Sequence, residues 1–131
     1  MAQPYTALAV LDRAFRGAVE GQYFDALYGV QEFHALLGRV DLALRGLAVT
    51  LAVEEDAYRP VLDIGQSTVD TLPDYRGSVR RMVDSGIVVL ADAGDLERLG
   101  FDPAKVIAGV RVVDTTALAA SWPDYDGVWF L

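Results

Sequence analysis

Tyr5–Leu11 (YTALAVL) and Val40–Leu44 (VDLAL) are the two short apolar runs that decide the fold. Residues 21–37 lie between them and carry apolar side chains three to four positions apart, which predicts a helix with one face on a sheet. These inward side chains are Tyr23, Leu27, Val30, Phe33 and Leu37. Gly38 supplies the stop that a helix of this kind needs. Strand, helix and strand in succession predict a βαβ unit and a parallel sheet.

The rest of the chain continues this alternation. We expect strands at residues 87–90, 110–113 and 127–131, helices at 74–85, 92–99 and 115–122, and a weaker strand at 61–65. Residues 47–53 are left as either a short helix or a strand, because an apolar run of this length fits both periods. The sequence therefore predicts one domain over residues 1–131, a three-layer α/β/α sandwich around a mostly parallel five-stranded sheet.

Composition excludes several classes of function. The chain has 131 residues with 19 acidic and 11 basic side chains, a net charge of −8, which argues against a nucleic-acid or anionic-membrane surface. It has no cysteine, which excludes disulfides, a thiolate nucleophile, a persulfide carrier and thiolate metal ligands. Its single histidine leaves no multi-histidine metal cluster. We therefore expect neither a metal nor a cofactor.

The sequence shows no signal peptide and no membrane-spanning segment that we can identify. The start, Met1-Ala2-Gln3-Pro4, has no basic segment ahead of a long apolar run, as a signal peptide would. No run reaches the ~18–20 apolar residues that span a bilayer. The longest, 42–53, is interrupted by Arg45 and Thr50. We expect a cytoplasmic protein that does not bind membranes.

Polar residues follow three of the predicted strands, at the sheet edge where open parallel sheets bind their ligands. The candidate ligand-binding residues are Arg13, Arg16, Gly17, Arg45 and Asp92. Arginines just ahead of a helix N-terminus favour a small anion. In the alternative interpretation the first two arginines are solvated or pair with nearby acids. No GxGxxG or GxxxxGK[ST] motif supports a nucleotide.

No residue is assigned a catalytic role. His34 lies beside Phe33 on the predicted helix and is interpreted as a packing residue rather than a base. The acidic residues around 54–56, 92–95 and 124–126 stand at predicted turns and helix starts, where carboxylates serve as caps. We therefore predict no metal site. Enzymatic activity is left open, with a non-enzyme favoured.

Aromatic residues gather near the end of the chain. Trp122, Tyr125 and Trp129 are interpreted as interface residues, because tryptophan and tyrosine are enriched where proteins associate. In the alternative, Trp129 or Phe130 fills the core from an alternating strand. The two interpretations are compatible in a small α/β domain.

Four segments carry a family resemblance: residues 95–101 (DLERLGF), 106–110 (VIAGV), 112–114 (VVD) and 126–131 (DGVWFL). They resemble the C-terminal half of the DsrE/DsrF/DsrH sulfur-relay family, and its DsrH (TusB-like) branch most closely. Val40–Leu51 is similar to that family's second strand and the apolar helix after it. Arg45 stands where the family usually has aspartate.

The resemblance implies a flavodoxin-like, five-stranded α/β domain that assembles into dimers, trimers or hexamers, often with related subunits. Working subunits of that family hand on sulfur as a cysteine persulfide. In DsrE-like members the cysteine follows the strand matching Ile87–Leu90, where this chain has Leu90-Ala91-Asp92. In DsrH-like members it lies in the first helix, and this chain has no thiol between Gly21 and Gly38.

We therefore expect a cysteine-less, non-catalytic subunit or binding module that forms a homo-oligomer, or a hetero-oligomer with related subunits. Its link to sulfur metabolism would run through a cysteine-bearing sulfur carrier as partner. The alternative is a domain, with enzymatic activity left open, that binds a small anion or small molecule. It would use the loop after the first strand and the N-terminus of the first helix.

Overall fold

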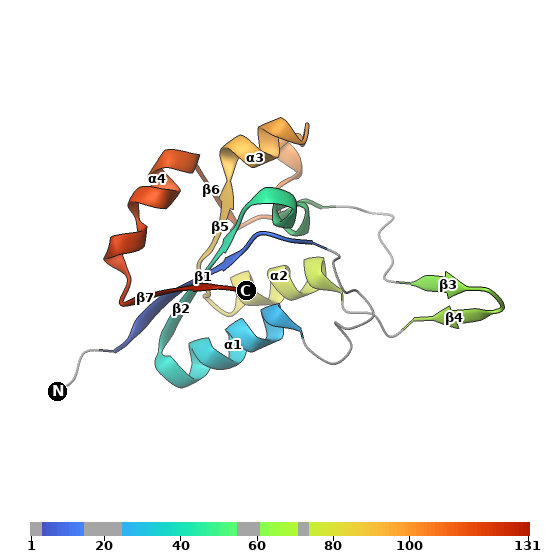
Figure 1. Cartoon of the computed structure of the whole chain (residues 1–131), viewed down its shortest axis with the longest axis horizontal. Helices are drawn as coiled ribbons and strands as arrows, with labels where there is room; N and C mark the ends of the chain where they lie inside the picture. Colours follow the sequence, from blue (N-terminus) through green and yellow to red (C-terminus); the bar gives the residue numbers. More distant parts are fainter. Residues whose placement is uncertain (1–3, 15–24, 55–60, 71–73) are drawn as a thin grey trace.

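The computed structural model describes residues 4–14, 25–54, 61–70 and 74–131 of the chain. Its main sheet consists of β1 (Thr6–Leu11), β2 (Arg39–Leu44), β5 (Val89–Asp92), β6 (Arg111–Val113) and β7 (Gly127–Phe130). The strand order is β6-β5-β2-β1-β7, and every neighbouring pair is parallel. Helices α1 (Ala26–Leu37) and α2 (Tyr75–Asp84) lie on one face and α4 (Thr115–Ala120) on the other (Figure 1). The predicted α/β/α sandwich is confirmed.

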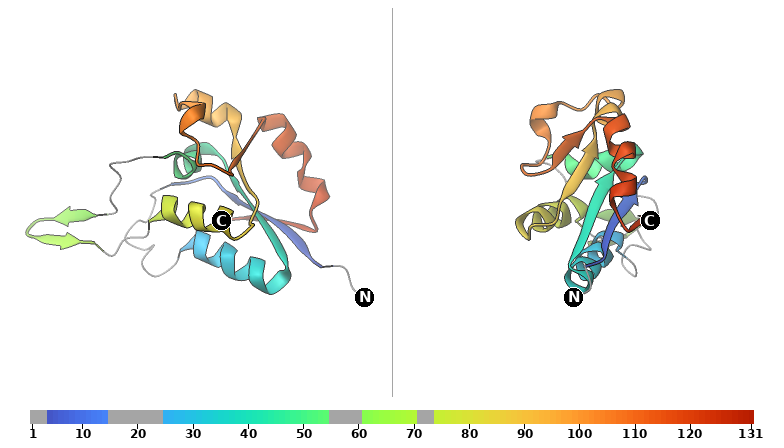
Figure 2. Two further views of the ribbon diagram at one scale, coloured as in Figure 1. Left: turned by 180° about the vertical axis from the view of Figure 1, so that it is seen from behind. Right: turned by 90° about the vertical axis from the view of Figure 1, so that its left-hand side faces the viewer.

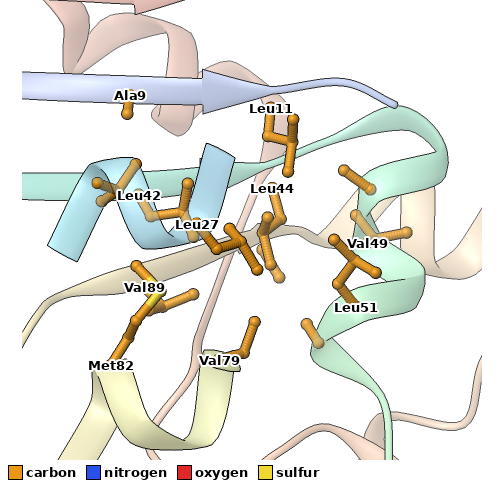
Figure 3. Packing of buried hydrophobic residues seen from close by; sticks show 14 of the residues in the cluster. Ala9, Leu11, Leu27, Leu42, Leu44, Val49, Leu51, Val79, Met82 and Val89 are labelled. Atoms are coloured by element: carbon orange, nitrogen blue, oxygen red, sulfur yellow. The ribbon is translucent and has the colours of Figure 1, made fainter. Parts of the chain in front are cut away.

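The central strands are apolar throughout because both of their faces are covered. In β1, Ala7, Ala9 and Leu11 belong to the core beneath α1 and α2, whereas Leu8 and Val10 belong to a smaller core beneath α4. Figure 3 shows the larger core, where side chains of β1, β2 and β5 meet Leu27 of α1 and Met82 of α2. A continuous apolar run is therefore the pattern that this sheet requires.

Helix α1 begins after Asp25, whose carboxylate accepts hydrogen bonds from the N–H groups of Leu27 and Tyr28 at 3.0 and 3.3 Å. It ends at Gly38 (φ 96°), as predicted. The expected inward face is confirmed for Leu27 and Val30 but wrong for Phe33, which is 49% exposed. The rings of Phe33 and Trp129 meet edge-on, with 5.5 Å between their centroids. Phe33 stays exposed because this side of α1 lies at the edge of the sheet, beside β7.

Residues 47–53, for which the sequence allowed either a helix or a strand, belong to a 3-10 helix, η2 (Gly46–Ala52). Its apolar side chains enter the larger core. Helix α2 follows Asp74, which caps the Gly77 N–H, and buries Val79 and Met82 as predicted. Strand β5 starts at Val89, two residues later than predicted. The Ile87 N–H still donates to the Met82 carbonyl, so Ile87 belongs to the end of the helix.

A hairpin of β3 (Leu62–Ile64) and β4 (Ser67–Val69) lies away from the main sheet (Figure 2). The weak strand at 61–65 was expected, but its antiparallel partner was not. The two strands are joined by two residues, and Gly65 at the turn has a φ of 60°. The Thr68 hydroxyl donates to the Asp63 carboxylate at 2.8 Å across the pair.

The last third alternates short helices and strands. Helix α3 (Ala93–Arg98) follows β5, and a 3-10 turn, η3 (Pro103–Lys105), comes before β6. Helix α4 ends at Ala120 rather than near Trp122, because Pro123 has no N–H with which to continue the helical hydrogen bonds. A 3-10 turn, η4 (Trp122–Asp124), then leads to β7. None of the helices in the described ranges is long and apolar enough to cross a membrane.

Candidate functional site

The carboxyl ends of β1, β2 and β5 meet at one edge of the sheet, as parallel strands require, and Arg45 lies at its centre. The Arg45 Nε donates to Asp12 Oδ1 at 2.6 Å and its Nη2 donates to Asp12 Oδ2 at 3.4 Å. The guanidinium carbon lies 5.3 Å from the centre of the Trp122 ring and 5.7 Å from that of Phe130. The hydrogen bonds to Asp12 raise the pKa of Arg45. This cation is held by one carboxylate and two aromatic rings.

Asp92, at the end of β5, is a buried carboxylate with structural partners. It is 3% exposed and accepts hydrogen bonds from the Asp95 N–H at 3.1 Å and from the Thr115 hydroxyl at 2.6 Å. It thereby caps α3 and ties that helix to the start of α4. A Cβ at Gly94 would lie 2.6 Å from the Thr115 hydroxyl, so this close approach needs glycine. Asp92 therefore holds two helices at the carboxyl edge.

Gly46 closes the edge between Asp12 and α3. Its N–H donates to Asp95 Oδ2 at 2.6 Å, and its φ is 56°. A Cβ at this position would lie 2.8 Å from the Asp12 carbonyl oxygen. Two features therefore require glycine here: the positive φ, and the close approach of the loop after β1, which leaves no room for a Cβ. Arg45 and Gly46 together connect β1, β2 and α3.

The loop after β1 contributes one exposed cation, Arg13. Arg16 and Gly17, which we also proposed as ligand-binding residues, lie outside the described residues. The described part of α1 begins at Ala26, and its N-terminal N–H groups already bond the Asp25 carboxylate. Of the five candidate residues, the structure therefore brings Arg45 and Asp92 to one edge of the sheet.

The three aromatic residues expected at an interface are partly buried, in two different places. Trp122 and Tyr125 pack on the smaller core beneath α4, and the Trp122 Nε1 is buried without a hydrogen-bond partner. Trp129 belongs to the other face, where it stacks on Tyr5 at 6.4 Å between ring centroids. Trp129 packs on the larger core, as the alternative interpretation expected of Trp129 or Phe130, and it also borders the open edge of the sheet.

The sequence interpretation missed a polar network at the other end of the α4 face. Asp41, in the middle of β2, is 1% exposed. It accepts hydrogen bonds from Arg39 at 2.9 and 3.2 Å and from the Tyr125 hydroxyl at 2.5 Å. Burial, reinforced by the Asp41 carboxylate, raises the pKa of Tyr125 to about 12. An acid inside an apolar strand was the available signal, since a buried carboxylate needs partners.

The remaining polar candidates have structural partners. The His34 Nδ1 accepts a hydrogen bond from the Val40 N–H at 3.0 Å, which ties α1 to β2. Glu54 pairs with Arg80 at 2.5 Å, and this hydrogen bond lowers the pKa of Glu54. Within the ranges that the structure describes, no three acidic or histidine side chains are grouped as metal ligands would be.

The strand order and the polar edge define the class to which this chain belongs: α/β proteins with an open parallel sheet in which the last strand returns beside the first. No model of a protein family matches the sequence, and no curated protein sequence matches it. The ychN protein from E. coli is similar in structure, with a TM-score of 0.71 and 14% identity over 98% of this chain and 100% of that one.

Two further solved structures are similar over almost their whole length. MTH1491 from Methanobacterium thermoautotrophicum, a protein of unknown function, gives a TM-score of 0.66 at 15% identity and covers 95% of this chain and 98% of its own. BT1422 from Bacteroides thetaiotaomicron, a conserved protein of unknown function, gives 0.63 at 14% identity and covers 95% and 94%. The chain thus has the DsrE-like fold of these neighbours. At this level of identity the likeness is one of fold alone.

Proposed function

We propose that this chain is a non-catalytic, oligomer-forming subunit or binding module of DsrE-like fold that transfers no sulfur itself. The observation that carries the proposal is the absence of cysteine from all 131 residues. No other side chain can replace a thiolate as a persulfide acceptor. The resemblance of the chain's last third to the DsrH branch supports an assembly with related subunits, in which a cysteine-bearing partner would carry the sulfur.

Asp92 supports this proposal from the position where the resemblance would put a DsrE-type cysteine. Its carboxylate is buried and satisfied by the Asp95 N–H and the Thr115 hydroxyl. Both of these hydrogen bonds end on the Asp92 Oδ1, so this carboxylate ties α3 to α4, and its removal would loosen the two helices together. We therefore interpret the end of β5 as a structural connection between α3 and α4. We interpret the chain itself as a subunit that functions within an assembly.

Native mass spectrometry of the tagged protein recovered from its own cells tests the proposal. We expect an oligomer, either of this chain alone or with a related subunit, and a cysteine-bearing sulfur carrier among the captured proteins. Incubation of the purified chain with a persulfide donor should leave its mass unchanged. A chain that stays monomeric and partner-free, both in the lysate and when concentrated, would contradict the proposed assembly.

A second candidate function is the binding of a small anion at the carboxyl edge. One observation favours it: the Arg45 Nη1 donates no hydrogen bond to any described residue, and the exposed Arg13 belongs to the neighbouring loop. Thermal-shift measurements with phosphate, sulfite, thiosulfate and nucleotides test it. A ligand at a hundredfold excess over its Kd stabilises by about 2.7 kcal/mol. If none of these anions stabilises the protein, or if Arg45→Gln responds as the wild type does, the candidate is excluded.

A further inference from the structure

Strand β7 is an edge of the main sheet, because among the strands that the structure describes only β1 pairs with it. The Leu131 N–H donates to the Val10 carbonyl at 3.0 Å. Peptide groups alternate in direction along a parallel strand, so the N–H and C=O groups of Val128 and Phe130 point away from β1. Each of these groups can bond to another strand.

Nothing in the strand protects this edge from such pairing. Folded proteins usually block an exposed edge with a charged side chain, a proline or a bulge. Residues 127–131 (GVWFL) contain no charged side chain and no proline. The adjacent acid, Asp126, bonds to β1: its carboxylate accepts hydrogen bonds from the N–H and hydroxyl of Thr6 at 2.8 and 3.1 Å.

Exposed apolar side chains border β7 on both faces of the sheet. On the α1 face, Phe33 is 49% exposed and lies against Trp129, and Leu36, one helical turn further along α1, is 77% exposed. On the α4 face, Phe130 is 60% exposed. We call this surface the β7 edge patch, and its members are Tyr5, Phe33, Leu36, Trp129, Phe130 and Leu131.

We propose that a second copy of this chain pairs its β7 with this β7 in antiparallel orientation, around a two-fold axis perpendicular to the sheet. The inference rests on the proposed oligomer and names its surface and its partner. A two-fold axis brings the same patch of both copies together, so an open edge flanked by apolar side chains complements itself. The two five-stranded sheets then form one continuous sheet across the interface.

Charge favours a second copy as the occupant, and the area of the patch approaches that of a standard interface. The chain carries a net charge of −8, yet no side chain of the β7 edge patch is charged, so two copies meet here without opposing side-chain carboxylates. Full burial of a phenylalanine or tyrosine covers 150–250 Å², so the exposed parts of this patch amount to about 500 Å². The main chain of the edge strand adds to this figure, and standard interfaces bury about 800 Å² on each partner.

Sedimentation equilibrium of matched variants tests the proposal. Leu36→Glu puts a charge into the β7 edge patch at a position exposed enough to leave the fold intact. Tyr28→Glu puts the same charge on another face of α1, at a side chain that is 61% exposed. We expect a dimer for the wild type, a Kd raised at least about tenfold by Leu36→Glu, and a change below about twofold for Tyr28→Glu. Equal effects of the two variants would overturn the proposal.

A cross-linking experiment tests the geometry independently. Because the chain has no cysteine, a single introduced cysteine can form a disulfide only with its copy. Phe130→Cys, on the edge strand, should give a covalent dimer under mild oxidation, whereas Tyr28→Cys should not. If the wild type is an oligomer but Phe130→Cys does not cross-link and Leu36→Glu does not dissociate it, this inference fails and the proposed oligomer stands. A wild-type protein that stays monomeric even with related subunits present would contradict both this inference and the proposed oligomer.

Discussion

Tyr125→Phe removes one hydroxyl from the buried network around Asp41, and its cost can be worked out from the structure. The hydroxyl donates to the Asp41 carboxylate at 2.5 Å, and Asp41 is 1% exposed. A hydrogen bond to a charged group contributes about 1.5–3 kcal/mol, so we expect a loss of about 2 kcal/mol in the free energy of unfolding. With an unfolding entropy of about 2.1 cal/mol/K per residue, this loss lowers the Tm by about 7 °C.

Urea and thermal unfolding followed by circular dichroism measure this loss. Tyr28→Phe is the matched control, because Tyr28 is 61% exposed and its hydroxyl faces water. The control should change stability by less than about 0.5 kcal/mol, as surface substitutions usually do. If Tyr125→Phe costs no more than the control, Asp41 is satisfied without the tyrosine, and the network does not hold the segment between α4 and β7 onto the sheet.

Three other predictions follow from the described contacts. Stability should fall as the pH rises from 10 to 12, because unfolded tyrosine ionises near pH 10 whereas folded Tyr125, with a pKa of about 12, keeps its proton. Urea titrations should show this fall in the wild type and a smaller one in Tyr125→Phe. Gly46→Ala should lower stability by about 1–3 kcal/mol, since its Cβ would lie 2.8 Å from a carbonyl oxygen at a φ of 56°. Gly65→Ala, strained in φ (60°) but in open space, should cost less in the same unfolding assay. Arg80→Gln should raise the pKa of Glu54 toward its usual value, because the Arg80 hydrogen bond lowers it. NMR titration of the Glu54 carboxyl measures the rise, and the stability from this pair should be present above the usual glutamate pKa and be lost as the pH falls through the lowered one.

The sequence was enough to predict the sheet, because burial on both faces leaves a readable signal. Runs such as Tyr5–Leu11, between turn residues and next to an amphipathic helix, favour a strand inside a covered sheet, and Asp74 and Gly38 mark helix ends by their chemistry. The antiparallel partner of β3 was not predictable in this way. Its strand, Ser67–Val69, has only three residues, too few to show the alternating pattern of a strand, although Gly65 in the turn before it is a residue that two-residue turns favour.

The sequence predicted where the candidate site lies in the fold, but not which of its side chains contact one another. The rule that polar residues gather at the carboxyl edge located Arg45 and Asp92. It could not show that Arg45 pairs with Asp12, 33 positions away, or that Asp92 bonds Thr115, because such partners depend on the finished packing. The position of Phe33 illustrates the same limit. A helical period shows which residues share a face, but not where the sheet beneath that face stops.

The return of β7 to the side of β1 has a consequence for how this protein is made. Thr6 and Asp126 are bonded across a separation of 120 positions. During synthesis, β1 therefore emerges from the ribosome long before β7, and its flank at Ala7–Val10 stays open for most of translation. Contacts of such wide separation close slowly. The flank of β1 that pairs with β7 is thus available for wrong strand pairing until residues 127–130 emerge.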